Sequence, residues 1–101
     1  MKSTQINVRN MRRSAALSDR IRQLSEKLEE DDPRIMHCRV AVEALGKRHS
    51  DGRHYAVSVN VHLPGHDFMA DRHEDEDVYV AVRDAFAAVS RQLEESRQPR
   101  Y

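Results

Sequence analysis

The sequence predicts an α+β domain with the element order β-α-β-β-β-α, in which two helices cover one face of a four-stranded mixed sheet. Two observations support this fold class. Several short segments alternate apolar and polar residues, which is the period of a strand with one buried face. Two longer segments carry apolar residues three and four positions apart, which is the period of an amphipathic helix. The 101 residues suffice for one small domain, expected over residues 1–97, with a frayed tail at 98–101.

The first strand and the first helix occupy the N-terminal third of the chain. The segment TQINVRN places Ile6 and Val8 on one face of a short strand, and NMRR follows as a turn. Ser14 is expected to cap a helix over about residues 15–30, because serine accepts hydrogen bonds from free backbone amides. The helix carries one apolar stripe and ends at EEDDP; the stripe consists of Leu17, Ile21, Leu24 and Leu28.

Three strands are expected next. RIMHCRVAVEAL, residues 34–45, alternates so that Met36 and Cys38 share one face with Val40, Val42 and Ala44. A polar and basic hairpin loop, GKRHSDGRH with Asp51-Gly52 at its tip, leads to the strand at residues 54–63. Pro64-Gly65 turns the chain into a weaker strand, HDFMADR. The other face of these strands is polar, so we expect it to be solvated.

The second helix follows four consecutive acids, Glu74 to Asp77, in the stretch RHEDEDVYVAVRDAFAAVSRQLEE. Carboxylates at a helix N-terminus interact with its unpaired amides and its positive dipole end, so capping explains the cluster. Such acids repel RNA, and this end is therefore expected to point away from phosphates. The buried stripe of the helix consists of Val78, Val82, Ala85, Phe86, Val89 and Leu93.

The charges balance overall but are unevenly distributed along the chain. There are 17 basic and 17 acidic residues, and EEDD and EDED together hold eight of the acids. Residues 1–13 hold Lys2, Arg9, Arg12 and Arg13 and no acid. Because exposed charges more than about 8 Å apart are largely screened at physiological salt, a locally basic surface can bind a polyanion on a neutral protein.

The chain has no apolar run of membrane-spanning length and does not begin with a signal peptide, so a cytoplasmic location is expected. The single cysteine, Cys38, excludes an internal disulfide and is expected to be a small core residue. The histidines show no metal-ligand spacing, and no elbow motif or glycine-rich phosphate loop is present. We therefore expect no cofactor, no metal site, no small-molecule substrate and no enzymatic activity.

The stretch HEDEDVYVAVRDAFAAVSRQLEE resembles the closing signature of the short ribosome hibernation-promoting factors, also called ribosome-associated inhibitors. That signature is a His-Glu-Asp, then a Tyr and an Ala, then a helix ending in Arg-Gln-Leu. Two additional acids, Glu76 and Asp77, precede the tyrosine here. The opening INVRNM, SAAL and KLEE are also similar to the start of that family. The matching residues are His73, Glu74, Asp75, Tyr79, Ala81, Arg91, Gln92 and Leu93.

The resemblance implies a fold similar to a double-stranded-RNA-binding domain and a role in silencing translation in resting cells. Members of the family bind the small ribosomal subunit in the channel that messenger RNA and tRNA would occupy. Some members promote the pairing of ribosomes and others oppose it. The implied partner of this chain is the small-subunit rRNA, with no membrane partner, and the chain itself is expected to be a monomer or weak dimer.

Basic side chains on the two helices and beside them are the predicted RNA contacts. Arg13, Arg20 and Lys27 recur every seven residues and fall near one line along the first helix. Arginine suits this role because its planar group pairs with phosphate and stacks on bases. A solvated helix face of alternating charge is the alternative interpretation. The full predicted set is Arg9, Arg12, Arg13, Arg20, Lys27, Arg72, His73, Arg83, Arg91 and Arg97.

A second hypothesis is a protein–protein module that shares the fold and makes no RNA contact. Salt dependence separates the two hypotheses, because phosphate contacts release counterions and protein contacts of low charge do not. If the helix arginines bind RNA, the double change Arg83→Glu and Arg91→Glu is expected to weaken cosedimentation with ribosomes.

Overall fold

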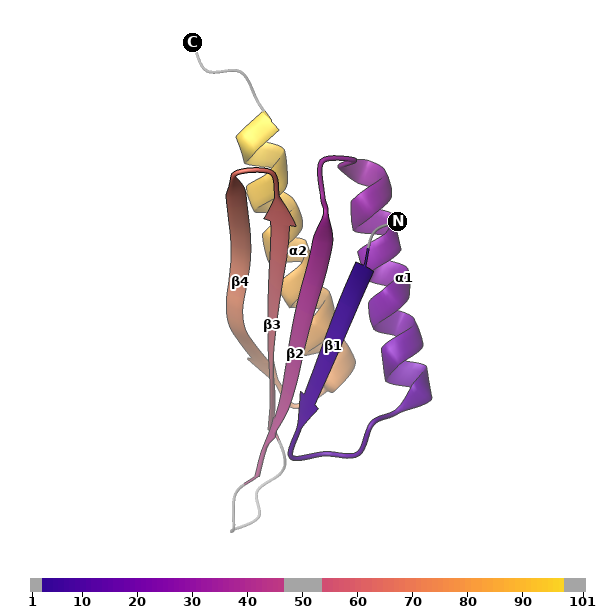
Figure 1. The fold of residues 1–101 in the computed structure, drawn as a ribbon. Helices are drawn as coiled ribbons and strands as arrows, with labels where there is room; N and C mark the ends of the chain where they lie inside the picture. The colour runs from indigo at the N-terminus through magenta and orange to yellow at the C-terminus, as the bar shows by residue number, and fades with distance from the viewer. Residues whose placement is uncertain (1–2, 47–53, 98–101) are drawn as a thin grey trace.

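The computed structural model describes residues 3–46 and 54–97 of the chain, in the order β-α-β-β-β-α (Figure 1). The element order and fold class match the prediction. The expected tail at 98–101 and the loop tip at Asp51-Gly52 lie outside the described residues. The elements are β1 (Ser3–Arg9), α1 (Ala15–Asp31), β2 (His37–Leu45), β3 (His54–Leu63), β4 (His66–Asp75) and α2 (Val78–Arg97).

The four strands form one mixed sheet in the order β1-β2-β3-β4. β1 pairs in parallel with β2, as expected for strands joined through a helix, and the other two pairs are antiparallel. One row of paired residues crosses the middle of the sheet on its covered side and is buried in every strand. It consists of Ile6, Val40, Val59 and Ala70.

Both helices pack on the same face of the sheet and run in the same direction, with the opposite face left uncovered (Figure 1). The apolar stripe of α1 buries Leu17, Ile21 and Leu28 against it. The stripe of α2 buries Val82, Ala85, Phe86, Val89 and Leu93, as the periodicity predicted. None of the helices in the described parts of the chain is long and apolar enough to cross a membrane.

The boundaries of two strands differ from the prediction. β2 begins at His37 rather than at residue 34, and Met36, expected in the core, is 51% exposed. Ile35 fills the core instead, at 1% exposure, because the chain has not yet entered the alternating strand geometry at that point. β4 extends to Asp75, so it includes the first two acids of the cluster expected to lie at the start of the helix.

One end of the molecule holds the end of β1, the end of β4 and the N-termini of both helices (Figure 1). Arg9, Glu43, Ala56 and Glu74 form one row across the sheet at this end. Arg9 and Glu74 are therefore separated by three strand spacings, about 14 Å. Basic and acidic segments that lie far apart in the sequence thus share one end of the fold, at opposite edges of the sheet.

Candidate nucleic-acid interface

The ten predicted RNA-binding residues are spread over several surfaces rather than gathered on one. Nine are exposed and His73, on β4, is half-buried. The set falls into three groups. Arg9, Arg12 and Arg13 lie at the end of β1 and in the connection to α1, Arg72 and His73 lie on β4, and the others lie on the helices, namely Arg20, Lys27, Arg83, Arg91 and Arg97.

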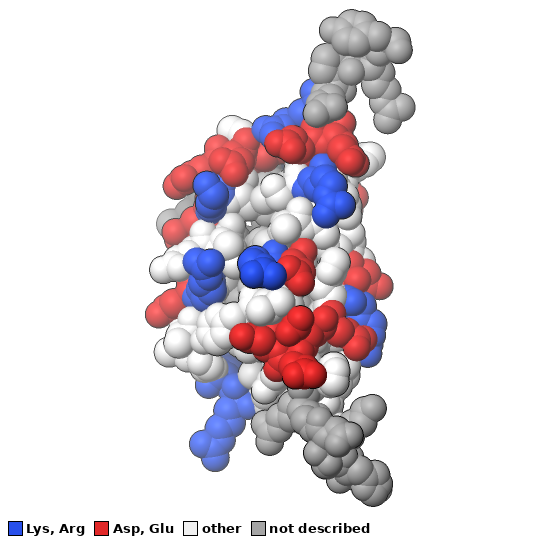
Figure 2. Space-filling model, turned by 180° about the vertical axis from the view of Figure 1, so that it is seen from behind, with Lys and Arg blue, Asp and Glu red and all other residues white. Residues whose placement is uncertain are grey.

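The helix face mixes charges of both signs, as Figure 2 shows from the helix side. Together α1 and α2 contain six basic and eight acidic residues, a net charge of −2. The Arg83 guanidinium lies 3.2 Å from the carboxylate of Asp84, and Arg20 donates to Gln23. The helix face is therefore not the continuous basic platform expected from the spacing of its arginines.

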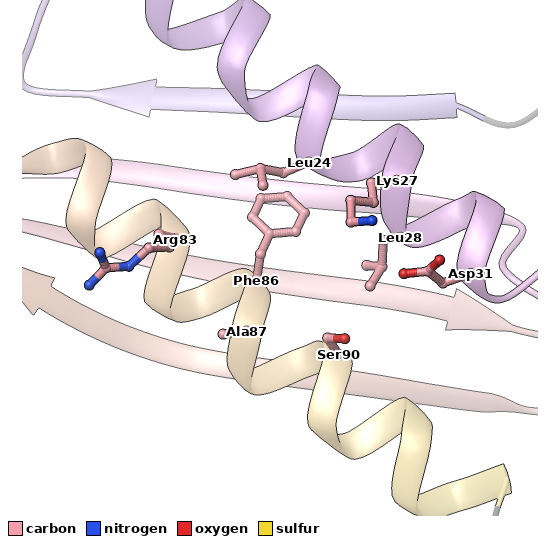
Figure 3. Close-up of a pocket in the computed structure, with 8 residues that line it drawn as sticks. All are labelled: Leu24, Lys27, Leu28, Asp31, Arg83, Phe86, Ala87 and Ser90. Atoms are coloured by element: carbon pink, nitrogen blue, oxygen red, sulfur yellow. The ribbon is translucent and has the colours of Figure 1, made fainter.

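A groove of about 230 Å³ runs between the helices (Figure 3). Its floor is mainly apolar, with Phe86 of α2 pointing toward Leu24 of α1. Lys27 and Arg83 contribute the two positive charges of its lining, and Asp31 contributes a negative one. Two cations and one acid give the groove a net charge of only +1.

The β1–α1 corner, defined as Arg9, Arg12 and Arg13 with the N-terminus of α1, differs from the helix face. The first acid in the chain is Asp19, and the first turn of α1 contains none. Glu43 of β2 pairs with Arg9 in the sheet and accepts from the Asn10 side chain at 3.5 Å, so one carboxylate lies beside the three arginines. Ser14 caps the helix with a neutral hydroxyl that accepts from the amide of Leu17 at 3.2 Å, as predicted. The positive end of the helix dipole therefore adds to the arginine charges.

Arg13 has a structural contact within this corner. Its guanidinium donates a hydrogen bond of 2.9 Å to the carbonyl of Ile6 on β1. The bond ties the connection back to the edge strand. Arg9 and Arg12, by contrast, make no hydrogen bond or ion pair with any residue that the structure describes, so their charges are available to a ligand.

The N-terminus of α2 is surrounded by acids, as the capping interpretation predicted. Asp77 accepts a hydrogen bond of 2.9 Å from the amide of Tyr79. Asp75 accepts one of the same length from the amide of Asp77. Glu74 forms an ion pair of 3.2 Å with Arg72, which lowers the availability of that arginine for RNA. The two helix N-termini thus present opposite charges to solvent.

Replacing Asp77 by alanine is expected to lower the free energy of unfolding by about 1 kcal/mol, the usual cost of losing an N-cap. Urea unfolding followed by circular dichroism measures this change. The matched control is Glu76→Ala, which removes the neighbouring exposed carboxylate and is expected to change stability by no more than about 0.5 kcal/mol. Equal effects of the two substitutions would contradict the capping role.

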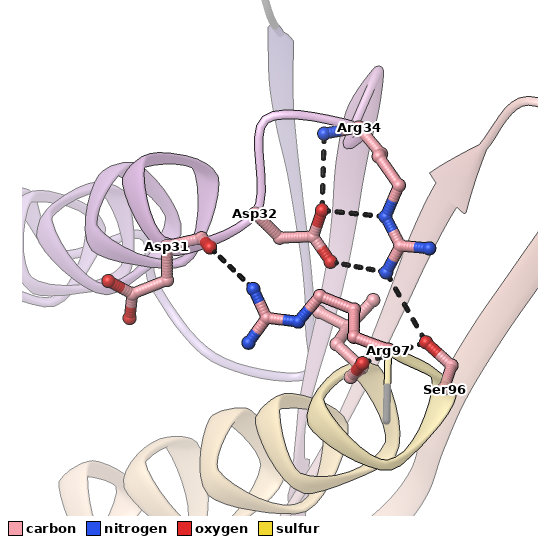
Figure 4. A network of polar contacts seen from close by, with 6 residues as sticks. Asp31, Asp32, Arg34, Ser96 and Arg97 are labelled. Carbon is pink, nitrogen blue, oxygen red and sulfur yellow. Dashed lines mark hydrogen bonds and ion pairs between the residues drawn. The ribbon is translucent and has the colours of Figure 1, made fainter. Parts of the chain in front are cut away.

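Polar contacts hold the C-terminal ends of the two helices together (Figure 4). Asp32 is buried, and its carboxylate accepts from the Arg34 side chain at 2.9 and 2.7 Å and from the Arg34 amide at 3.2 Å. The same guanidinium lies 3.3 Å from the hydroxyl of Ser96 on α2. Arg97 donates to the carbonyl of Asp31 at 2.9 Å. Arg97 is therefore engaged in packing.

Sequence reasoning missed two exposed cations, Arg22 on α1 and Arg39 in the centre of β2. Neither makes a hydrogen bond or ion pair with another residue in the described ranges. The alternation of β2 did place Arg39 on the polar sheet face. Arg39 lacks a partner because of the residues of β1 and β3 that lie beside it. Only the strand register identifies those residues.

The described residues contain no group of three or more His, Cys, Asp or Glu side chains placed to hold a metal ion. Cys38 is buried on β2, as expected. Burial raises the pKa of its thiol to about 11, so the thiol is protonated and unreactive at neutral pH.

Comparison with known proteins identifies the family. A model of the family described as sigma 54 modulation protein / S30EA ribosomal protein matches residues 4–100. The chain belongs to this family. The assignment confirms the resemblance to the hibernation-promoting factors, a family of ribosome-associated factors rather than a class of enzymes.

Two solved structures share the fold of this family member. A ribosomal subunit interface protein from Coxiella burnetii superimposes with a TM-score of 0.79 at 20% identity, over 94% of this chain and 97% of that chain. The N-terminal domain of Thermus thermophilus Protein Y superimposes with a TM-score of 0.73 at 21% identity, over 96% of this chain and 100% of that chain. No match was found among curated proteins. At these identities the two structures show the fold alone.

Proposed function

We propose that this chain is a ribosome hibernation factor that binds small-subunit rRNA through its β1–α1 corner and stops translation by occupying the mRNA–tRNA channel. The observation that carries the proposal is the sign of the local charge. The corner combines the unpaired Arg9 and Arg12 with a helix N-terminus whose cap, Ser14, is uncharged. The two helices, by contrast, have a net charge of −2. Family membership supplies the ribosome as partner.

Two acidic groups lie near the charge of the corner. Glu43 pairs with Arg9 in the sheet and offsets one of the three arginine charges, which leaves a net charge of +2. The acidic cluster is more distant and does not cancel the remainder. Glu74 is about 14 Å from Arg9 across the sheet. The Debye length at physiological salt is about 8 Å, so the two ends of this row act almost independently on a solvent-exposed ligand. The orientation that follows places the β1 edge against phosphates and the start of α2 away from them. Both sequence predictions, arginine contacts and an outward acidic cluster, are compatible in that orientation.

Binding alone accounts for the proposed inhibition. A folded body in the channel excludes message and tRNA without any bond being made or broken. The sheet and both helices share one buried core, so they form a single body. The proposal places the protein in the cytoplasm with the ribosomes on which it acts.

The dependence of ribosome binding on salt tests the proposal. Purified protein is pelleted with isolated small subunits over a series of potassium chloride concentrations. The affinity is expected to fall steeply, with a slope of log affinity against log salt near −0.7 for each phosphate contacted in single-stranded RNA and near −0.9 in a duplex. Retention on the subunit that is indifferent to salt would instead favour the protein–protein hypothesis.

A further inference from the structure

The open sheet face carries a hollow of about 220 Å³ near its centre. The face is the side of the sheet that the helices leave uncovered (Figure 1). The small side chain of Ala41 leaves room for the hollow, because its neighbours are longer. The side chains that line it are Asn7, Arg39, Ala41, Ser58, Asn60 and Met69.

Arg39 is the charged group of this hollow. Strand register places Gln5, Arg39, Asn60 and Met69 in one row across the sheet. Arg39 is exposed, and no hydrogen bond or ion pair joins it to another described residue. The carboxamides of Asn7 and Asn60 line the same hollow and offer both donors and acceptors. The guanidinium plane is thus free to stack or pair with a planar ligand.

The neighbouring row adds two aromatic rings. The rings of His37 and His62 stack with centroids 4.8 Å apart and an interplanar angle of 16°. A contact between His62 Nδ1 and Asp67 Oδ1 holds the His62 ring in place. Met69, also on this face, is 49% exposed. Stacked rings, an exposed thioether and an unpaired guanidinium are surfaces on which bases of single-stranded RNA stack.

We infer that the open sheet face binds an unpaired base of a single-stranded RNA segment at Arg39, with the carboxamides of Asn7 and Asn60 contacting the base edge. The inference rests on the proposed function, which supplies RNA as the ligand. A base fits better than a phosphate, because Asp71 on β4 holds Ser58 beside the hollow and would repel an anion.

The hollow and the β1–α1 corner are neighbours along β1. Asn7 and Arg9 point to the same side of β1 and are two residues apart, about 7 Å. One strand of RNA can therefore place a phosphate at Arg9 and a base in the hollow. The two surfaces then have different roles. The corner binds the RNA backbone, and the open face distinguishes unpaired from paired bases.

Fluorescence anisotropy with a short unstructured RNA and with a duplex of the same sequence tests the inference. Arg39→Ala is expected to weaken binding of the single strand about tenfold, the loss typical of one stacked base, and to leave duplex binding within about twofold. Arg39→Lys is expected to lose nearly as much, because an ammonium keeps the charge but does not stack. Arg22→Ala, on α1 beside Glu26 and Glu29, removes an exposed arginine from another surface; it is the matched control and is expected to bind as the wild type does.

Three results would overturn the base site: wild-type protein that does not bind the single strand, Arg39→Ala that loses single strand and duplex equally, or Arg39→Lys that binds normally. The same preparations are pelleted with small subunits. If the wild type pellets in a salt-sensitive way but Arg39→Ala binds the single strand normally, the base site is wrong and the ribosomal function stands. If the wild type binds the single strand selectively but does not pellet with small subunits, the base site is supported and the ribosomal function is wrong.

Discussion

The double substitution Arg9→Glu and Arg12→Glu is expected to lower the affinity for small ribosomal subunits about a hundredfold. Each arginine is exposed and unpaired among the described residues, so each is free to bind a phosphate. A charge-assisted hydrogen bond contributes about 1.5–3 kcal/mol, and 1.4 kcal/mol corresponds to a factor of ten. Pelleting with isolated subunits at fixed salt measures the loss.

The matched control for this prediction is Arg83→Glu with Arg91→Glu, which changes the net charge equally but on the helix face. A smaller loss, about tenfold, is expected there, because Arg83 already lies against Asp84 and the face around it is acidic overall. A larger loss from the helix variant than from the corner variant would show that the RNA lies along the helices.

Asp32→Ala is expected to lower the free energy of unfolding by about 2 to 3 kcal/mol. The carboxylate is 3% exposed and accepts three hydrogen bonds from Arg34, which joins the end of α1 to the start of β2 and reaches Ser96 (Figure 4). Removing the buried carboxylate leaves the charged Arg34 donor without its acceptor, and a lost charge-assisted hydrogen bond has a cost of this size. The cost is not larger, because the Arg34 side chain is 45% exposed and water can hydrate it. Urea unfolding measures the change.

The control is Asp31→Ala, one residue earlier. The Asp31 side chain is exposed, and Arg97 binds its carbonyl rather than its carboxylate, so the substitution is expected to change stability by less than about 0.5 kcal/mol. Similar losses of stability from both substitutions would mean that Asp32 acts only through its negative charge at the C-terminal end of α1, and not through its hydrogen bonds.

The contribution of Asp32 has a definite pH dependence. The hydrogen bonds from the Arg34 guanidinium lower the pKa of the Asp32 carboxyl below its ordinary value. A carboxyl with a lowered folded-state pKa stabilises the fold above its unfolded value, about 3.9, and loses that contribution as the pH falls through the folded value. The stability difference between wild type and Asp32→Asn should therefore be constant near neutral pH and shrink below about pH 4.

Much of the fold could be predicted because its signals are local. The period of Leu17, Ile21 and Leu28 identifies a helix and its buried face, and Ser14 marks where it begins. The alternation from Val57 to Val61 identifies a strand in the same way. Met36 was misplaced because alternation does not show where a strand starts, and Ile35 is an equally suitable core residue.

The candidate surface was harder to predict, because the charge of a surface depends on contacts between distant segments. The spacing of the helix arginines predicts a line of cations, but it does not show that Arg83 pairs with Asp84 or that Arg97 bonds to the end of α1. The row through Arg39 depends on the register of three strands. The concentration of positive charge before Asp19, in contrast, was visible in the sequence.

Tethered hydroxyl-radical cleavage of rRNA tests most directly whether the β1–α1 corner touches the ribosome. An iron chelate is attached to a cysteine introduced by Ala15→Cys at the start of α1 or by Ala87→Cys in the middle of α2, both exposed positions. Cys38 is buried and protonated, so it leaves the new thiol as the reactive one. Strong cleavage of small-subunit rRNA from position 15 and weak cleavage from position 87 is the expected result. Strong cleavage from position 87 with none from position 15 would contradict the account.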